Sequence, residues 1–143
     1  MPRHAAALRP ARRRKCPAAI GEASRRFGGI DVMIFAGGVP IAQPFVSRID
    51  ESSWRDVFET ELIGFTRVVA ATLPIFRTQG GGCFVSVVSV ATHSYPPGDA
   101  LSAVPKAGIE MLGRAIAKEE GRYGIGPIWS RLVSSTLGSV QPS

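Results

Sequence analysis

The sequence has few of the residues on which disulfide-rich, zinc-binding or membrane-spanning proteins depend. Its 143 residues include two cysteines and two histidines, too few for a disulfide framework or a Cys/His zinc cluster, so we expect no metal site. The longest apolar runs, Val68–Phe76 and Phe84–Ala91, fall well short of the roughly 20 residues that span a bilayer. Basic residues also occupy the place of a signal peptide's apolar segment. These absences predict a cytoplasmic protein without a membrane partner.

Acidic residues are missing from the first fifteen positions, and this absence explains the basic character of the chain. Six of the 17 lysines and arginines lie there, which leaves 11 basic against 11 acidic groups elsewhere and accounts for the net charge of +6. We therefore expect a basic tail over residues 1–15, a domain over residues 16–138 and a short tail over residues 139–143. The tail has no interleaved aromatic residues and no groove-reading motif, so we expect no nucleic-acid partner.

The rest of the chain alternates helical and strand patterns, which predicts an α/β fold with a parallel sheet. Helical spacing or capping signals mark three segments, namely Pro17–Phe27, Ser53–Thr78 and Ser102–Arg122. Short apolar runs bounded by glycines or loops mark three strands, namely Ile30–Phe35, Phe84–Ser89 and Ile128–Val133.

Local signals within the two long helices give more specific expectations. Ser53, followed by Asp56, is the candidate N-cap of the first of them, and Pro74 should bend or end that helix. Ser102 is the candidate N-cap of the second. The apolar stripe of the second helix is expected at Val104, Ala107, Met111, Leu112, Ala115 and Ile116.

Four segments, in order, resemble the short-chain dehydrogenase/reductase family. RFGGIDVMIFAGGV (26–39) resembles the fourth strand and the turn after it. WRDVFETELIGFTRVVAATLP (54–74) resembles the long interface helix. GGGCFVSVVSVA (80–91) resembles the strand that carries the catalytic serine, and ALSAVPKAGIEMLGRAIAKE (100–119) resembles the helix with the Tyr-x-x-x-Lys pair. The resemblance implies a Rossmann-like, doubly wound sheet, here partial with about three strands and their flanking helices, and an NAD(P)-dependent oxidoreductase acting on a small carbonyl or alcohol.

The resemblance implies catalytic positions at Ser89, Ser102 and Lys106. In the family a tyrosine stands at the position of Ser102 and exchanges the proton, while the lysine lowers the pKa of that tyrosine and binds the cofactor ribose. An aliphatic hydroxyl is much harder to ionise than a phenol, which makes Ser102 a poor general acid. Tyr95, in the loop after Ser89, is a weaker candidate for a substitute acid.

Further departures concern the cofactor NAD or NADP. The resemblance implies cofactor contacts at Ala36, Gly37, Gly38 and Lys106, although the family's asparagines in this turn are absent. The family's helix asparagine aligns with Glu61, for which a solvated or ion-paired helix residue is favoured over a buried functional carboxylate.

The first βαβ unit, with its glycine-rich turn for the pyrophosphate, has no counterpart in the 29 residues before Ile30. We therefore expect a truncated, degenerate member of the family with very weak dinucleotide binding and little or no activity. The alternative is a non-catalytic module that pairs through its two long helices, either with itself or with a full-length relative.

Overall fold

The computed structural model describes residues 15–38 and 43–132. Its longer helices are α1 (Lys15–Phe27), α2 (Glu51–Val57), α3 (Ile63–Gln79) and α4 (Ala100–Glu120). Its strands are β1 (Val32–Phe35), β2 (Gly82–Ser89) and β3 (Ile125–Leu132). Short turns of 3-10 helix cover Val46–Arg48, Val90–Thr92 and Gly121–Tyr123, and a π-helical turn covers Phe58–Leu62 between α2 and α3.

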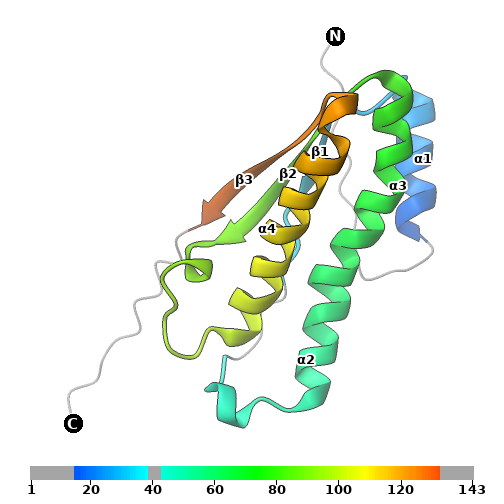
Figure 1. Cartoon of the computed structure of the whole chain (residues 1–143). Coiled ribbons are helices and arrows are strands. Elements are labelled where there is room, and N and C mark those ends of the chain that lie inside the picture. Colours follow the sequence, from blue (N-terminus) through cyan, green and yellow to red (C-terminus); the bar gives the residue numbers. More distant parts are fainter. Residues whose placement is uncertain (1–14, 39–42, 133–143) are drawn as a thin grey trace.

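The three strands form one parallel sheet in the order β1-β2-β3, with helices in each crossover (Figure 1). Val32 pairs with Cys83 at the start of β1, and Gly82 pairs with Ile125 at the start of β3. This arrangement confirms the predicted partial doubly wound α/β fold. The predicted strands begin and end within a few residues of the observed ones, and Val133, the last predicted strand residue, lies outside the described residues.

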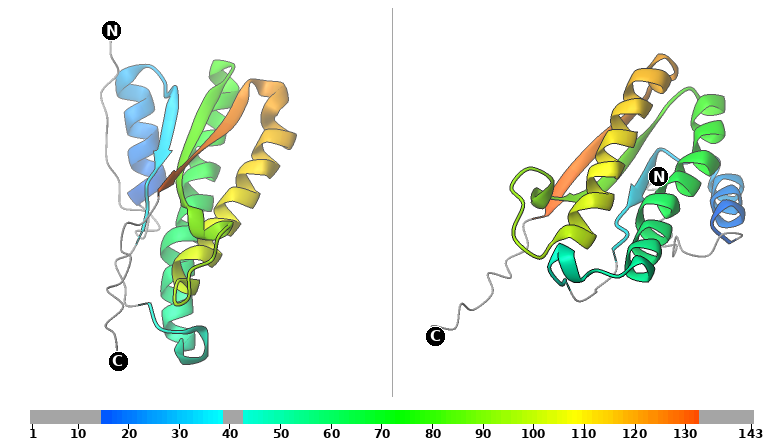
Figure 2. Two further views of the ribbon diagram at one scale, coloured as in Figure 1. Left: turned by 90° about the vertical axis from the view of Figure 1, so that its left-hand side faces the viewer. Right: turned by 60° about the horizontal axis from the view of Figure 1, so that its bottom comes forward.

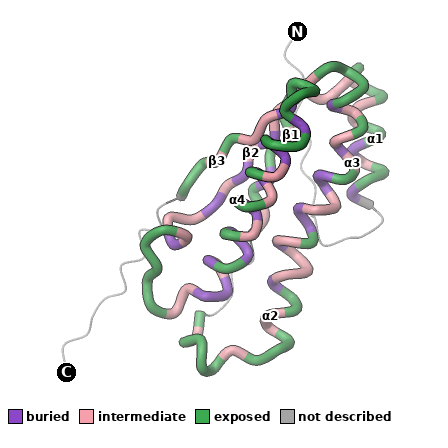
Figure 3. The backbone as a smooth tube through the Cα atoms, viewed as in Figure 1, coloured by how far each residue is buried: buried purple, intermediate pink, exposed green. Residues whose placement is uncertain are grey.

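The helices α1, α3 and α4 lie together on one face of the sheet (Figures 1 and 2). Alternate β2 residues, Phe84, Ser86 and Val88, are buried under them, as expected for side chains that alternate between the two faces of a strand. Val32 and Ile34 alternate with the buried Phe35 on β1, which places them on the other face, and they are 49% and 64% exposed. Figure 3 maps burial along the described chain. Among the described residues, no helix covers that second face.

Aromatic rings form the centre of the core between the sheet and the helices. Phe65 of α3 lies 4.9 Å from Phe35 and 6.4 Å from Phe84 between ring centroids, and Phe76 lies 5.0 Å from Phe84. Such tilted and edge-to-face pairs add to the stabilisation that burial itself provides. The rings pack α3 against Phe35 at the end of β1 and Phe84 near the start of β2, and so hold this crossover helix against the sheet.

The observed helix starts correct two capping expectations. Asp50, and not Ser53, is the N-cap of α2: its carboxylate accepts the Ser53 N–H at 2.8 Å. Ser102 lies inside the first turn of α4, where its N–H donates to the Asp99 carbonyl at 3.2 Å. In both cases the helix begins two residues before the predicted start. The Asp50 side chain caps α2, whereas Asp99 precedes α4 without a side-chain capping hydrogen bond.

Pro74 does not end its helix, since α3 continues to Gln79 and closes on Gly80 in the left-handed conformation. The N–H that proline lacks costs one hydrogen bond, which the packing of Phe76 into the core outweighs locally. The end of α3 is therefore set by Gly80, with φ 85°, and not by the proline.

The inward face of α4 also differs from the predicted stripe. Val104 and Met111 are 46% and 60% exposed, whereas Ile109 and Ile116 are buried with Lys106, Glu110 and Gly113. The inward face thus carries charged and small residues, which an apolar periodicity cannot mark. Most of the predicted stripe lies beside that face or points to solvent.

The described residues begin at the end of the expected basic tail and include no membrane-spanning helix. α1 begins at Lys15, the last residue of the expected basic tail; residues 1–14, and the expected short tail after residue 138, lie outside the described residues. Within residues 15–38 and 43–132, none of the helices combines the length and the apolar character that crossing a bilayer requires.

Candidate functional site

The candidate residues gather beyond the carboxyl ends of the first two strands. Ser89 is the last residue of β2, and Gly37 follows the end of β1 by two positions. Lys106 lies in the first third of α4, the helix that follows β2. In open parallel sheets, ligands bind in the crevice outside these carboxyl ends, so the fold brings the predicted positions to the expected edge.

Lys106 joins three segments that are far apart in the sequence. Its Nζ donates a hydrogen bond to the Gly37 carbonyl at 2.5 Å and lies 3.0 Å from Oε2 of Glu61. The Lys106 and Glu61 side chains are only 10% and 5% exposed. The turn after β1, the π-helical turn and α4 therefore meet at one buried ammonium group.

Glu61 is thus buried and ion-paired, so the expectation of a solvated helix residue is wrong and the expectation of an ion pair is confirmed. It lies in the π-helical turn Phe58–Leu62. Such turns insert one extra residue into a helix and are frequent at functional sites. The inserted residue changes which side chains face α4, and this change is invisible in a regular helical pattern.

Of the three turn residues expected to contact a cofactor, Gly37 is the one placed beside Lys106. Ala36 and Gly38 are exposed. A Cβ at Gly37 would lie 2.7 Å from the ring of Phe35, so a glycine is needed for the backbone to pass over that ring. This close approach puts the Gly37 carbonyl within reach of the lysine.

Ser89 and Ser102 do not bond to Lys106. The Ser89 hydroxyl accepts the Ala91 N–H at 3.1 Å and so caps the short turn Val90–Thr92. Among the described residues, no hydrogen bond or ion pair joins either serine to the lysine. Tyr95, the substitute acid considered above, is 52% exposed in the loop before α4.

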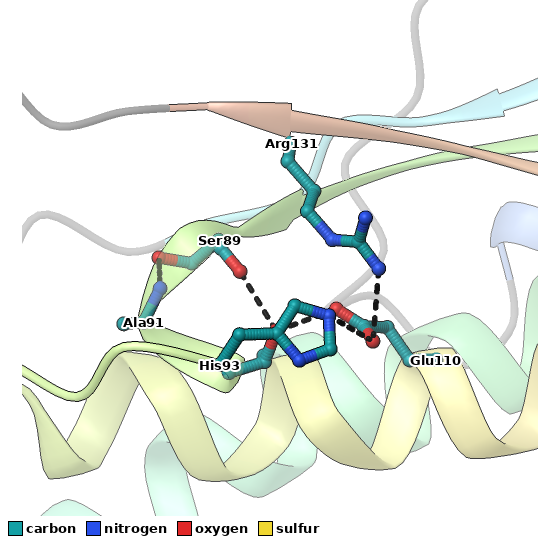
Figure 4. A network of polar contacts seen from close by, with 6 residues as sticks. Ser89, Ala91, His93, Glu110 and Arg131 are labelled. Atoms are coloured by element: carbon teal, nitrogen blue, oxygen red, sulfur yellow. Dashed lines mark hydrogen bonds and ion pairs between the residues drawn. The ribbon is translucent and has the colours of Figure 1, made fainter.

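A second polar cluster, which the sequence reasoning missed, lies next to Ser89 (Figure 4). The carboxylate of Glu110 accepts a hydrogen bond from the Thr92 hydroxyl at 2.7 Å. It also lies 3.8 Å from Arg131 Nη2 and 4.0 Å from His93 Nε2. Thr92 Oγ1 also lies 2.9 Å from the Ser89 carbonyl oxygen, and the two acceptors share its single hydroxyl proton, so the cluster ties the end of β2 to α4 and β3.

One signal could have drawn attention to Glu110. It follows Lys106 by four positions, and residues at this spacing share a helix face. A buried lysine at one position therefore suggested a second inward-facing charge at the other.

Thiol and metal chemistry find little support in the described residues. Burial raises the pKa of both Cys16 and Cys83, which keeps the thiols protonated and poorly nucleophilic at neutral pH. Cys83 also lies near the start of β2, at the opposite end of that strand from Ser89. Within residues 15–38 and 43–132, no group of three or more His, Cys, Asp or Glu side chains is arranged to hold a metal ion.

Comparison with known proteins gives a consistent result. The family model for short chain dehydrogenases matches residues 4–128. Among curated proteins, 3-oxoacyl-acyl-carrier-protein reductase of Staphylococcus aureus is 30% identical over 108 residues, which are 76% of this chain and 44% of that protein. An uncharacterized oxidoreductase of Schizosaccharomyces pombe is 29% identical over 106 residues, again 44% of its length.

Solved structures share the fold described above. A short-chain dehydrogenase from Streptomyces avermitilis superposes with a TM-score of 0.80 at 25% identity, over 88% of this chain and 46% of that one. A gluconate 5-dehydrogenase from Burkholderia cenocepacia, solved with NADP and tartrate, gives a TM-score of 0.78 at 24% identity over 87% and 49%. The chain therefore spans less than half the length of the first of these proteins and about half of the second.

Proposed function

Because the chain belongs to the short-chain dehydrogenase/reductase family, we propose that it carries the nicotinamide-side half of an NAD(P)-dependent oxidoreductase site, with little or no turnover by itself. The observation that carries this proposal is the contact between Lys106 and the Gly37 carbonyl. It joins the helix and the turn to which the sequence resemblance assigns cofactor contacts, at the edge of the sheet where such ligands bind.

The residues present fit one end of a dinucleotide better than the other. An ammonium group has three N–H donors, and Lys106 donates one of them to Gly37 with Glu61 beside it, so at least one remains for a ribose hydroxyl. Among the described residues, no helix begins on a glycine-rich turn, the feature that binds a pyrophosphate. A bound dinucleotide would supply the hydride, while Lys106 and the Gly37 turn would hold its ribose.

The proton step is the weak point of this site. Ser102 lies one turn before Lys106 on α4, where the family resemblance calls for a tyrosine. An aliphatic hydroxyl does not ionise in the range in which a phenol does, so it cannot exchange a proton efficiently with a carbonyl or alcohol. The family resemblance supports a small carbonyl or alcohol as the substrate class. The weak proton step leads us to propose that its turnover is very low.

The proposal is tested by titrating NADH and NADPH into the purified chain and following nucleotide fluorescence, with Lys106→Met as the comparison. We expect no saturation in the micromolar range, because the pyrophosphate contacts are missing. We also expect no carbonyl-dependent oxidation of NADPH above that of the Lys106→Met variant. Micromolar binding that is lost in Lys106→Met, or turnover that depends on Lys106, would contradict the proposed weakness of the site.

A second candidate function is self-association through α2 and α4, and one observation favours it. Trp54, Arg55, Phe58 and Val104 line a shallow hollow of about 450 Å³, and Met111 is exposed two turns further along α4. Exposed apolar side chains on neighbouring helices are a feature that protein interfaces use. The partner would be a second copy of the chain or a full-length relative.

Sedimentation of the wild type and of Met111→Glu tests this second proposal. We expect a concentration-dependent dimer that the glutamate disrupts, whereas Ile128→Glu, on the opposite face of the sheet, should leave it intact. A wild-type chain that sediments as a monomer at all concentrations would refute self-association.

A further inference from the structure

The buried ammonium of Lys106 is balanced by a carboxylate at the point where a ligand would approach it. Glu61 Oε2 lies 3.0 Å from Lys106 Nζ, and both side chains are at most one-tenth exposed. Burying a charge without a partner is costly, so each group offsets the cost of burying the other. The local net charge of the pair is zero.

We propose that Glu61 is a specificity-determining residue: it holds Lys106 in place and keeps the pair neutral, so that the remaining N–H of Lys106 donates to an uncharged hydroxyl and the site discriminates against an anion. The hydroxyl ligand rests on the proposed function, whereas the rejection of anions rests only on the charges of the described residues.

Distance decides between a hydroxyl and an anion. A ligand oxygen that accepts a hydrogen bond from Lys106 would lie about 2.8 Å from its nitrogen, and therefore no more than about 6 Å from the Glu61 oxygen. At this separation, in a buried site, two negative charges repel strongly because solvent screens them little. The repulsion offsets part of the attraction between an anion and the Lys106 ammonium, whereas a neutral hydroxyl accepts a hydrogen bond from Lys106 without any such loss.

The π-helical turn offers a built-in comparison for this role. Glu59 lies in the same turn and pairs with Arg67 at 2.5 Å, with its side chain 38% exposed. Its charge is thus neutralised by a different partner, away from Lys106. Replacing Glu59 removes the same charge from the turn, but it leaves the Lys106–Glu61 pair intact. It therefore serves as the matched control.

The test measures thermal unfolding of the full chain in inorganic phosphate and in chloride at equal ionic strength. Phosphate stabilises many proteins through exclusion from their surfaces. The informative quantity is therefore the phosphate-dependent rise in melting temperature of each variant minus that of the wild type. We expect Glu61→Gln to show a larger phosphate-dependent rise in melting temperature than wild type, because its Lys106 is no longer neutralised. Glu59→Gln should behave as wild type.

A second variant covers the case in which Glu61→Gln does not fold in chloride. Phosphate should then restore a cooperative transition to Glu61→Gln, and the double variant Glu61→Gln/Lys106→Met, which buries no charge at this point, should fold in both salts without an excess response. An equal phosphate response in wild type, Glu61→Gln and Glu59→Gln would overturn the proposal, as would failure of phosphate to rescue an unfolded Glu61→Gln. Neither outcome depends on dinucleotide binding, so the proposed function can fail separately.

Discussion

Replacing Glu61 and Lys106 singly and together measures how strongly the buried pair couples the site to the fold. At 3.0 Å and an effective dielectric constant of about 20, the Coulomb attraction is about 5–6 kcal/mol, and most of it offsets the cost of removing both charges from water. Removing one partner leaves the other charge buried and unpaired. We therefore expect Glu61→Gln and Lys106→Met each to lower the free energy of unfolding by about 3–5 kcal/mol.

The double variant should lose far less than the sum of the two single losses. Its remaining defect is the Gly37 carbonyl, which no longer accepts the hydrogen bond of Lys106, and this costs about 1 kcal/mol. Urea unfolding followed by circular dichroism gives all four free energies. The exposed pair of Glu51 and Arg55 is the control, for which a coupling of only a few tenths of a kcal/mol is expected.

Additive losses at Glu61 and Lys106 would refute this reasoning, because independent groups cannot be neutralising one another. A loss below about 1 kcal/mol in either single variant would likewise mean that the remaining charge reaches water, in contrast to its burial in the structure.

Three further predictions concern α2, the core and the proton step. Hydrogen bonds from Ser52 and Ser53 lower the pKa of Asp50 to about 2. The ionised Asp50 therefore stabilises the folded state at pH values above its unfolded pKa near 4, and this stabilisation is lost as the pH falls toward 2. Asp50→Ala should therefore lower the melting temperature at neutral pH and flatten its acid dependence, and an unchanged acid transition would count against the cap. Gly113→Ala should cost about 1–3 kcal/mol because the new Cβ would lie 2.8 Å from the Trp129 ring, whereas Gly121→Ala, with open space around it, should be nearly neutral in the same urea assay. Ser102→Tyr should restore no NADPH-dependent turnover, since a general acid cannot replace the pyrophosphate contacts that the described residues do not offer; measurable turnover would place the defect at residue 102 alone.

The order of helices and strands could be predicted because each of those elements has a pattern of its own. Short apolar runs such as those around Ile34 and Phe84 are typical of strands buried in parallel sheets, and the long amphipathic segments between them require crossovers. Element boundaries shifted by a few residues where a cap was misjudged, as with Asp50. Local capping depends on which of several adjacent polar residues adopts an extended backbone, and composition does not determine that choice.

The structure brings together two of the expected site positions, and it also shows neighbours of theirs that sequence periodicity could not indicate. Lys106 and the Gly37 turn follow from the family resemblance, and the structure places them in contact. The burial of Glu61 and Glu110 does not follow from periodicity, which assigns charged residues to the solvent face; only the spacing of Glu110 from Lys106 hinted at the second of them. Here the inward face of α4 carries charges that are satisfied by partners from distant segments, and only the folded arrangement identifies those partners.

The pairing of the strands has a consequence for how the chain reaches its fold. Val32 pairs with Cys83, and Gly82 pairs with Ile125. Both strand pairs of the described sheet therefore join segments that are separated in sequence by an entire helical crossover. No pair can form early from a local hairpin, and the loop-closure entropy of each crossover must be overcome before sheet contacts compensate for it. Folding should therefore be slow, with α3 and α4 forming first and β2 acting as the common template. During that interval the apolar side chains of all three strands remain in water, where they can drive aggregation.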